Sequence, residues 1–306
     1  MRLTTPTPGP APNFPPRLFE VEPAMNHARS SVSSLLRIGA CLSAALLLTA
    51  FAAFDSTRAV AAPPAAGALL PLAGASVGQA GFGTIKGRLI WNGAVPVPKP
   101  LATEKDPEVC GKPPIYDRGF AVDAKTKGIK HGIAYLVAPK GKNPEAEKAL
   151  LANAATVVVD QKNCEFIPYT LAMHKDQALD FKSSDPVNHN IRYTGFANGG
   201  FNQMLAPNGT IQRKLVAEKR VLPLACDIHP WMKGFVMVLD HPFFAITGED
   251  GSFEIKGVPA GAQNIVVWQD KVGYVTAGLG RGQVVNVTAG ATVDIGDVKL
   301  DPAKVK

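Results

Sequence analysis

The feature that most constrains the fold is a series of short alternating apolar segments separated by turn residues. Between residues 155 and 240, such segments follow one another at close spacing, and Gly (29 residues) and Pro (26 residues) are abundant in the chain of 306 residues. Closely spaced short strands favour a β-sandwich over long helices. The segments are Thr156–Asp160, Leu171–Met173, Ala178–Phe181, Asn190–Tyr193, Thr210–Leu215 and Gly234–Leu239. We therefore expect an all-β protein.

A second group of strands follows Asp240. Phe243–Gly261 contains two alternating runs joined by Asp250-Gly251, which predicts a β-hairpin. Further strands are expected at Asn264–Trp268, Gly282–Val287 and Ala291–Leu300. These segments predict a second, smaller β-module over residues 241–301.

Residues 83–154 precede the first group of strands and contribute strands of their own. Gly83–Trp91 and Gly128–Val137 alternate in the manner of strands. Asn143, followed by a first-turn Pro and Glu, is a typical N-cap, so we expect a short helix to about Ala152.

The first 61 residues are expected to be a disordered leader with an export signal at 25–61. Two arginines precede the apolar run Ile38–Phe54, and an Ala-x-Ala motif ends at Ala61. No two arginines are adjacent, which favours the general secretory route, with cleavage after Ala61 and a periplasmic or secreted product. The alternative is an uncleaved membrane anchor, because the apolar run is near the lower length limit of a spanning helix. Residues 62–82 form an Ala/Pro/Gly linker.

Charge and composition narrow the possible partners. The formal net charge is +7 and hydrophobic residues make up 46% of the chain, enough for a substantial core. Lys and Arg do not form blocks interleaved with aromatic residues, so nucleic-acid binding is not expected. A mildly basic surface is compatible with docking to an acidic redox partner.

Cys226, His229 and Met232 place a thiolate, an imidazole and a thioether within seven residues. Upstream, Asp185-Pro-Val-Asn-His189-Asn190 supplies a second imidazole, between two Asn and just past a strand-like run. Two His nitrogens, one Cys sulfur and a weak axial Met make a trigonal site that suits copper electron transfer. We predict a site made of His189, Cys226, His229 and Met232. The alternative is a buried Cys and a core Met without a metal.

Residues 155–240 resemble the cupredoxins, the plastocyanin and amicyanin group. The resemblance lies in Phe166-Ile-Pro168, in the Ser184–Asn190 loop and in the Cys-x2-His-x2-Met spacing. It implies a Greek-key β-sandwich holding one type 1 (blue) copper ion that cycles between Cu(I) and Cu(II). Asn190 matches a residue whose backbone N–H is expected to hydrogen-bond to the Cys226 sulfur.

The resemblance also implies how the site meets the surface. The ring edge of His229 is expected to reach solvent, and Pro230 and Trp231 either form an apolar docking patch or pack the loop. The chain departs from many members of the group at Ala225, where they have an aromatic residue before the Cys.

Residues 243–300, together with Gly83–Trp91, resemble carboxypeptidase regulatory-like (transthyretin-like) modules. The matching stretches are Thr247–Ile255 and Gly257–Gly261. The resemblance implies an Ig/transthyretin-like β-sandwich. The first strand of such a module normally lies close to these motifs, so we predict that the cupredoxin is inserted within the module. This requires Gly83–Trp91 to pair with a strand after residue 243.

Cys110 and Cys164 remain in a chain predicted to be exported. An oxidising compartment favours a disulfide between them, which would stabilise the fold by about 4 kcal/mol on the loop-entropy model. The alternatives are two free thiols or an additional metal site. A disulfide here leaves Cys226 unpaired, as the copper site requires.

These predictions favour an exported electron carrier that exchanges single electrons with a redox protein such as a c-type cytochrome or an exported dehydrogenase. One alternative is a copper-storing or carrier protein with the same ligands. Another is a cell-envelope or carbohydrate-binding β-module without a redox role. An enzyme is not expected, because no Ser-His-Asp arrangement, phosphate loop or paired carboxylates stand out and four protein ligands leave no position for a substrate.

Overall fold

A computed structural model describes residues 81–305, and these form an all-β structure with one α-helix, which confirms the predicted fold class. No helix in this described part of the chain is both long and apolar enough to cross a bilayer. The predicted leader (1–61) and nearly all of the predicted linker (62–82) lie outside the described residues, so export and cleavage stay predictions.

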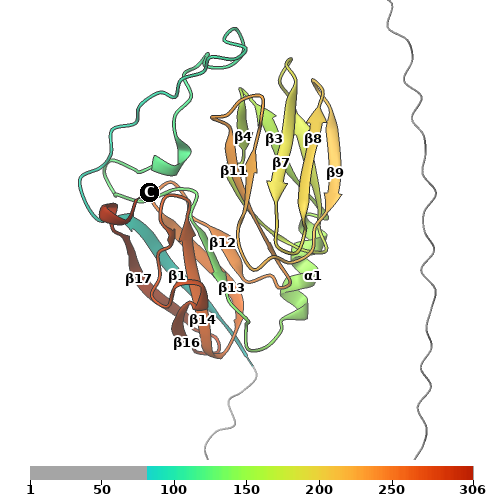
Figure 1. Cartoon of the computed structure of the whole chain (residues 1–306). Helices are drawn as coiled ribbons and strands as arrows, with labels where there is room; N and C mark the ends of the chain where they lie inside the picture. Colours follow the sequence, from blue (N-terminus) through green and yellow to red (C-terminus); the bar gives the residue numbers. More distant parts are fainter. Residues whose placement is uncertain (1–80, 306) are drawn as a thin grey trace, which may run out of the picture. The chain divides into compact units, whose positions relative to one another are not determined.

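Nine strands, β3 to β11, form the first sandwich (Figure 1). They are β3 (Thr156–Lys162), β4 (Glu165–Ile167), β5 (Thr170–His174), β6 (Ala178–Ser183), β7 (His189–Thr194), β8 (Gly200–Leu205), β9 (Thr210–Lys214), β10 (Leu222–Ala225) and β11 (Lys233–Leu239). One sheet has the order β4-β3-β6-β9 and the other β5-β11-β10-β7-β8. Alternate side chains of both sheets, such as Phe181, Ile191 and Val236, are fully buried in a shared core.

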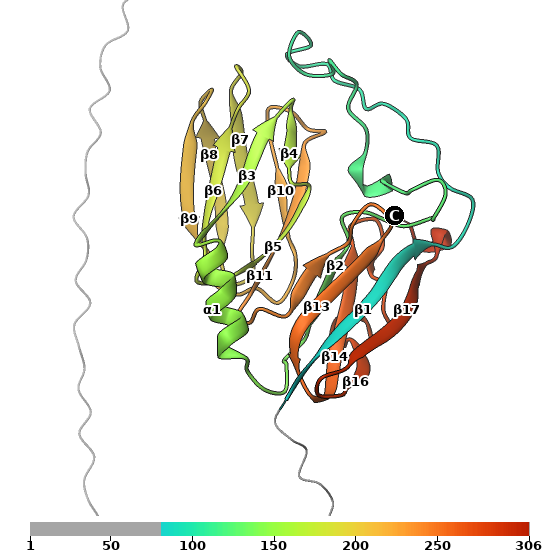
Figure 2. The same ribbon diagram turned by 180° about the vertical axis from the view of Figure 1, so that it is seen from behind.

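The second sandwich takes strands from both sides of the first in the sequence. Its strands are β1 (Phe82–Trp91), β2 (Ile133–Leu136), β12 (Phe244–Ile246), β13 (Ser252–Pro259), β14 (Gly261–Gln269), β15 (Gly273–Tyr274), β16 (Gln283–Val287) and β17 (Thr292–Leu300). Figure 2 shows β1, in cyan, between β13 and β17; the pairing is antiparallel with β13 and parallel with β17. The pairing that the insertion hypothesis requires is therefore present, and β3 to β11 lie between β2 and β12 in the chain.

Two local predictions were wrong. The predicted hairpin around Asp250-Gly251 is not a paired hairpin, because β12 pairs with β2 whereas β13 pairs with β1 in the other sheet. The predicted strand Gly128–Val137 is reduced to β2, since His131 has a positive φ of 69° that interrupts an extended backbone.

The predicted helix is confirmed as α1 (Pro144–Asn153). The Asn143 side chain accepts a hydrogen bond from the Ala146 N–H at 3.1 Å and donates to the Gly257 carbonyl at 2.9 Å. The same residue therefore caps the helix and ties its start to the second sandwich.

A long covering segment, residues 92–132, joins β1 to β2 and contains the short 3-10 turn η1 (Arg118–Phe120). Cys110 and Ile115 of this segment are buried in the core of the first sandwich. The predicted disulfide is confirmed: Cys110 is bonded to Cys164, which lies between β3 and β4. The covering segment is thus attached to the sandwich at the edge where the predicted ligands lie.

The turn between β12 and β13 leaves no room for a side chain at Gly251, so a substitution there should strongly lower the stability of the protein. Gly251 has a φ of 77°, and a Cβ there would lie 2.1 Å from the Leu89 carbonyl oxygen. Gly251→Ala should lower the free energy of unfolding by at least about 2 kcal/mol, because a steric clash adds to the left-handed backbone cost. Gly273 is the matched control, with a φ of 78° and nothing within 4 Å of its Cβ position, so Gly273→Ala should cost about 1 kcal/mol. Equal losses in denaturant unfolding would contradict the predicted clash.

Candidate metal centre

Three of the four predicted ligands converge at one end of the first sandwich. The Cys226 Sγ lies 3.9 Å from His189 Nδ1 and 3.8 Å from His229 Nδ1, and the two Nδ1 atoms are 2.9 Å apart. Both imidazoles are fully buried and Cys226 is 2% exposed. Within the described residues, Cys226 is the cysteine that forms no disulfide.

The strand order explains why residues 37 positions apart meet. His189 opens β7, and β10 ends at Ala225, directly before Cys226. These two strands are antiparallel neighbours, so the start of one adjoins the end of the other. The loop then turns back tightly, with the Met232 N–H donating to the His229 carbonyl at 2.9 Å, before β11 begins.

Asn190 fixes the two ligand-bearing segments to each other. Its side-chain oxygen accepts a hydrogen bond from the Asp227 N–H at 2.6 Å, and its own N–H lies 3.5 Å from the Cys226 sulfur. Its side-chain amide donates to Asn202 on the neighbouring strand at 2.7 Å. The contact between N–H and sulfur is the one that the cupredoxin resemblance implies for this residue.

Met232, the predicted axial ligand, is 1% exposed and belongs to the same core cluster as Cys226. A thioether in that position lies among apolar side chains such as Leu224 and Val236. This environment suits a weak, long ligand contact as well as it suits simple core packing.

Two carboxylates hold the outer edges of the imidazoles. His189 Nε2 donates to Asp185 at 2.9 Å, and His229 Nε2 donates to Asp106 at 2.9 Å. These bonds assign the proton of each ring to Nε2 and leave the two Nδ1 atoms to face Cys226, which is the usual way in which an outer partner orients a metal-binding His.

The expectation that the ring edge of His229 reaches solvent was wrong. The side chain has no exposed surface, because the covering segment brings Asp106 over its Nε2 edge. This segment has no counterpart in the residues that carried the cupredoxin resemblance, so the local motif gave no sign of it.

The environment changes the pKa values of these groups. Burial opposes a charged imidazole, yet the hydrogen bond to Asp185 and the nearby Cys226 sulfur raise the pKa of His189 to about 9. Burial also opposes a thiolate, but His189 and the Asn190 N–H lower the pKa of Cys226. Burial lowers the pKa of His229, and Asp106 only partly offsets this effect. The site therefore favours a thiolate, the form that binds a metal.

The spacing of the donors fits one metal ion. With metal–nitrogen and metal–sulfur distances of about 2.05 and 2.3 Å, ligands at 120° are about 3.8 Å apart, which agrees with the two sulfur–nitrogen separations. The separation of the two nitrogens, 2.9 Å, corresponds to an angle of about 90° at the metal for the same bond lengths. Thiolate and imidazole donors suit copper, and His189, Cys226 and His229 would hold it, with Met232 buried in the same core cluster as Cys226.

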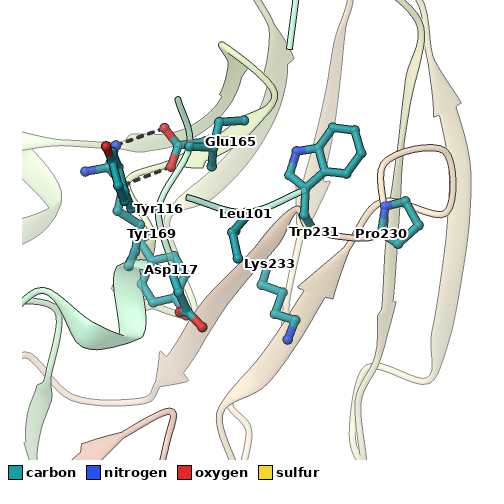
Figure 3. A pocket seen from close by; sticks show the side chains of 10 residues that line it. Leu101, Tyr116, Asp117, Glu165, Tyr169, Pro230, Trp231 and Lys233 are labelled. Atoms are coloured by element: carbon teal, nitrogen blue, oxygen red, sulfur yellow. Dashed lines mark hydrogen bonds and ion pairs between the residues drawn. The ribbon is translucent and has the colours of Figure 1, made fainter. Parts of the chain in front are cut away.

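Trp231 packs the ligand loop and also borders the surface. Its ring centroid lies 5.2 Å from that of His229, and its Nε1 donates to the Cys164 carbonyl at 3.2 Å. It lines a pocket of about 120 Å³ (Figure 3), with Pro230 beside it and Tyr116, Tyr169 and Glu165 on the other side. Trp231 thus serves the packing role, and it borders this pocket as well.

Known copper proteins are similar to part of the chain in structure. No protein-family model and no curated protein match the chain. Part of the chain is similar to an amicyanin mutant in its reduced Cu(I) form at pH 4, with 19% identity over 28% of this chain and 90% of that one and a TM-score of 0.25. A Cu-containing nitrite reductase from Thermus scotoductus matches with 20% identity over 28% of this chain and 22% of that one, also with a TM-score of 0.25.

Reasoning from the sequence missed the roles of both aspartates. Asp185 stands four residues before His189 and was visible as part of the same loop, and a carboxylate near a predicted His ligand is a usable signal. Asp106 carries no such signal, because it is 123 residues from His229 and is brought there only by the covering segment.

The raised pKa of His189 predicts how metal uptake depends on pH. A metal must displace the proton that His189 holds below about pH 9, so the apparent copper affinity should rise with pH up to about 9 and then level off. Asp185→Asn removes the charge that favours this proton, so the plateau should begin at a lower pH. Competition titrations with a chelator at a series of pH values measure both curves. A curve for the wild type that is flat between pH 6 and 9 would contradict the assignment.

Proposed function

We propose that the protein is an exported type 1 copper protein that carries single electrons between redox partners. The observation that carries the proposal is the buried set of His189, Cys226 and His229 at metal-ligand separations. When bound, copper supplies the one-electron couple. The partner we propose is a c-type cytochrome or an exported dehydrogenase, in the periplasm or outside the cell.

The surroundings of the site support electron transfer because they restrict movement of the ligands. The two imidazoles are each fixed by an aspartate, and Asn190 holds the His189 and Cys226 segments together. Ligands held in this way keep nearly the same arrangement when the charge of the metal changes, which keeps the reorganisation small. A site that only stores copper does not need this rigidity.

The storage or carrier function is the second candidate, and it is favoured by the burial of the imidazole that was expected to face solvent. A closed site retains its metal, but it leaves fewer direct routes for an electron. The two candidates differ in one measurable property: a carrier of copper binds the ion without exchanging electrons with a cytochrome at a useful rate.

The second sandwich is proposed to be a carboxypeptidase regulatory-like module into which the cupredoxin is inserted. The pairing of β1 with β13 and β17 supports this topology. We assign no ligand to it; its role in the proposal is to anchor the covering segment that starts after β1. Contacts such as the hydrogen bond of 2.7 Å from the Tyr169 hydroxyl to Asp270 link the two sandwiches.

The spectrum of the copper-loaded protein tests the proposal. Residues 62–306 loaded with Cu(II) should bind one ion and show an intense blue charge-transfer band, which Cys226→Ser should abolish while the fold survives. Met232→Leu should keep the band and raise the reduction potential, because it removes a weak donor that favours Cu(II) at similar volume. Met237→Leu, a buried methionine outside the site, is the matched control and should change neither. A colourless copper complex of the wild type would refute the type 1 assignment.

Trp231 is proposed as the side chain through which electrons leave, because the His229 edge is closed and the two rings are 5.2 Å apart. Trp231→Leu should slow electron exchange with a small soluble cytochrome several-fold and leave the visible band unchanged. Trp268→Leu is the matched control, since Trp268 is a partly buried tryptophan of the second sandwich. Stopped-flow measurement of both variants gives the result, and equal rates for Trp231→Leu and wild type would rule out this route.

A further inference from the structure

The Cys110–Cys164 disulfide lies against the metal centre. Its two sulfur atoms and one nitrogen of His229 all lie within 4.8 Å of one another, and the Cys164 sulfur lies equally close to a nitrogen of His189 and an oxygen of Asp185. Cys110 is 1% exposed and Cys164 is fully buried. A disulfide that only attached the covering segment could lie anywhere along the edge of the sandwich, so its position next to both imidazoles calls for a chemical explanation.

Each cysteine is connected to one of the imidazoles through an aspartate. The Asp185 carboxylate accepts hydrogen bonds from the Asn163 and Cys164 N–H groups at 2.7 and 2.8 Å while it holds His189. The Asp106 carbonyl accepts from the Cys110 N–H at 2.8 Å, while its carboxylate holds His229. The sulfur atoms and the imidazoles are therefore positioned by the same two residues.

Cys164 occupies a backbone position that does not favour cysteine. Asn163 and Cys164 form the two-residue turn between β3 and β4, with φ values of 54° and 55°. Such a turn prefers Asn-Gly, and a side chain at its second position is held in the left-handed region at a cost of about 1 kcal/mol. The turn tolerates this cost because Asp185 binds both of its N–H groups, and the result is a sulfur atom placed beside His189.

We propose that reduction of the Cys110–Cys164 disulfide opens a second metal site beside the first, in which the two thiolates bind one Cu(I) ion as a two-coordinate pair. The inference rests on the position of the disulfide and not on the electron-transfer role of the first site. Soft thiolates select Cu(I), whereas Zn(II) takes four ligands. The Asp185 carboxylate beside Cys164 is already engaged by two N–H groups and His189.

The reaction balances with a dithiol as reductant. The dithiol gives two electrons, the sulfur–sulfur bond breaks, two protons add to the Cys110 and Cys164 sulfurs, and the reductant leaves as its own disulfide. Binding of Cu(I) then releases these two protons to solvent. The oxidised protein has no free thiol at this position, so the second site exists only in the reduced state.

The test counts the Cu(I) ions that the full chain binds in competition with a chromophoric Cu(I) chelator. One sample is oxidised, and the other is reduced with dithiothreitol and then desalted without oxygen. Thiol titration verifies that reduction adds two thiols while circular dichroism shows a folded protein. We expect the wild type to bind one more ion after reduction. The doubly substituted Cys110→Ser/Cys164→Ser protein should bind the same number in both conditions.

The variant Cys226→Ser separates this inference from the proposed function, because it keeps Cys110 and Cys164 and removes a ligand of the first site only. It should bind no ion at the first site, yet gain one on reduction. A gain by Cys226→Ser supports the second site even if the first proves not to be a type 1 centre. Three results overturn the inference: no gain on reduction, a disulfide that is reduced only when the protein unfolds, or displacement of Cu(I) from the reduced cysteines by an equal concentration of Zn(II).

Discussion

The structure depends on the junction between the start of β7 and the end of β10, which Asn190 holds through its contacts to Asp227 and Cys226. Without it, the His189 loop and the Cys226 loop would be two unconnected turns at one end of a sandwich. A side-chain amide that bridges two loops in a buried setting stabilises the fold by more than the sum of its separate hydrogen bonds. Once the first bond has formed, each further bond orders the loops at little additional cost in entropy. The candidate metal centre is thus a property of the strand pairing beneath it.

The covering segment makes this site different from an open loop site at the end of a β-sandwich. It begins at β1 in the second sandwich and is bonded through Cys110 to the β3–β4 turn, so both sandwiches take part in closing the centre. Its Asp106 removes solvent from the outer edge of His229 and fixes the orientation of the ring. The burial and the orientation of the His229 ring therefore come from a part of the chain that contributes none of the four predicted ligands.

The sequence predicted most strands of the first sandwich, because alternation of apolar residues records which face of a strand is buried. It did not predict β8, in which Leu205 is the one buried residue. It also predicted α1, whose cap and first-turn proline are local signals, and the pairing of Cys110 with Cys164. It failed at Asp250-Gly251, where the turn signal was read as a hairpin. Turn residues specify a change of direction, but whether the flanking strands pair depends on β1 and β2, which compete for them.

By itself, the sequence determined the all-β class and the residue types of the candidate centre, since period-two alternation and the Cys-x2-His-x2-Met spacing are local properties. Only the tertiary structure decided that His189 faces Cys226, that Asp185 and Asp106 hold the imidazoles, and that the disulfide adjoins both. These contacts join residues as far apart as 123 positions. Contacts over such separations follow from strand order and from the path of the covering segment, neither of which a local pattern encodes.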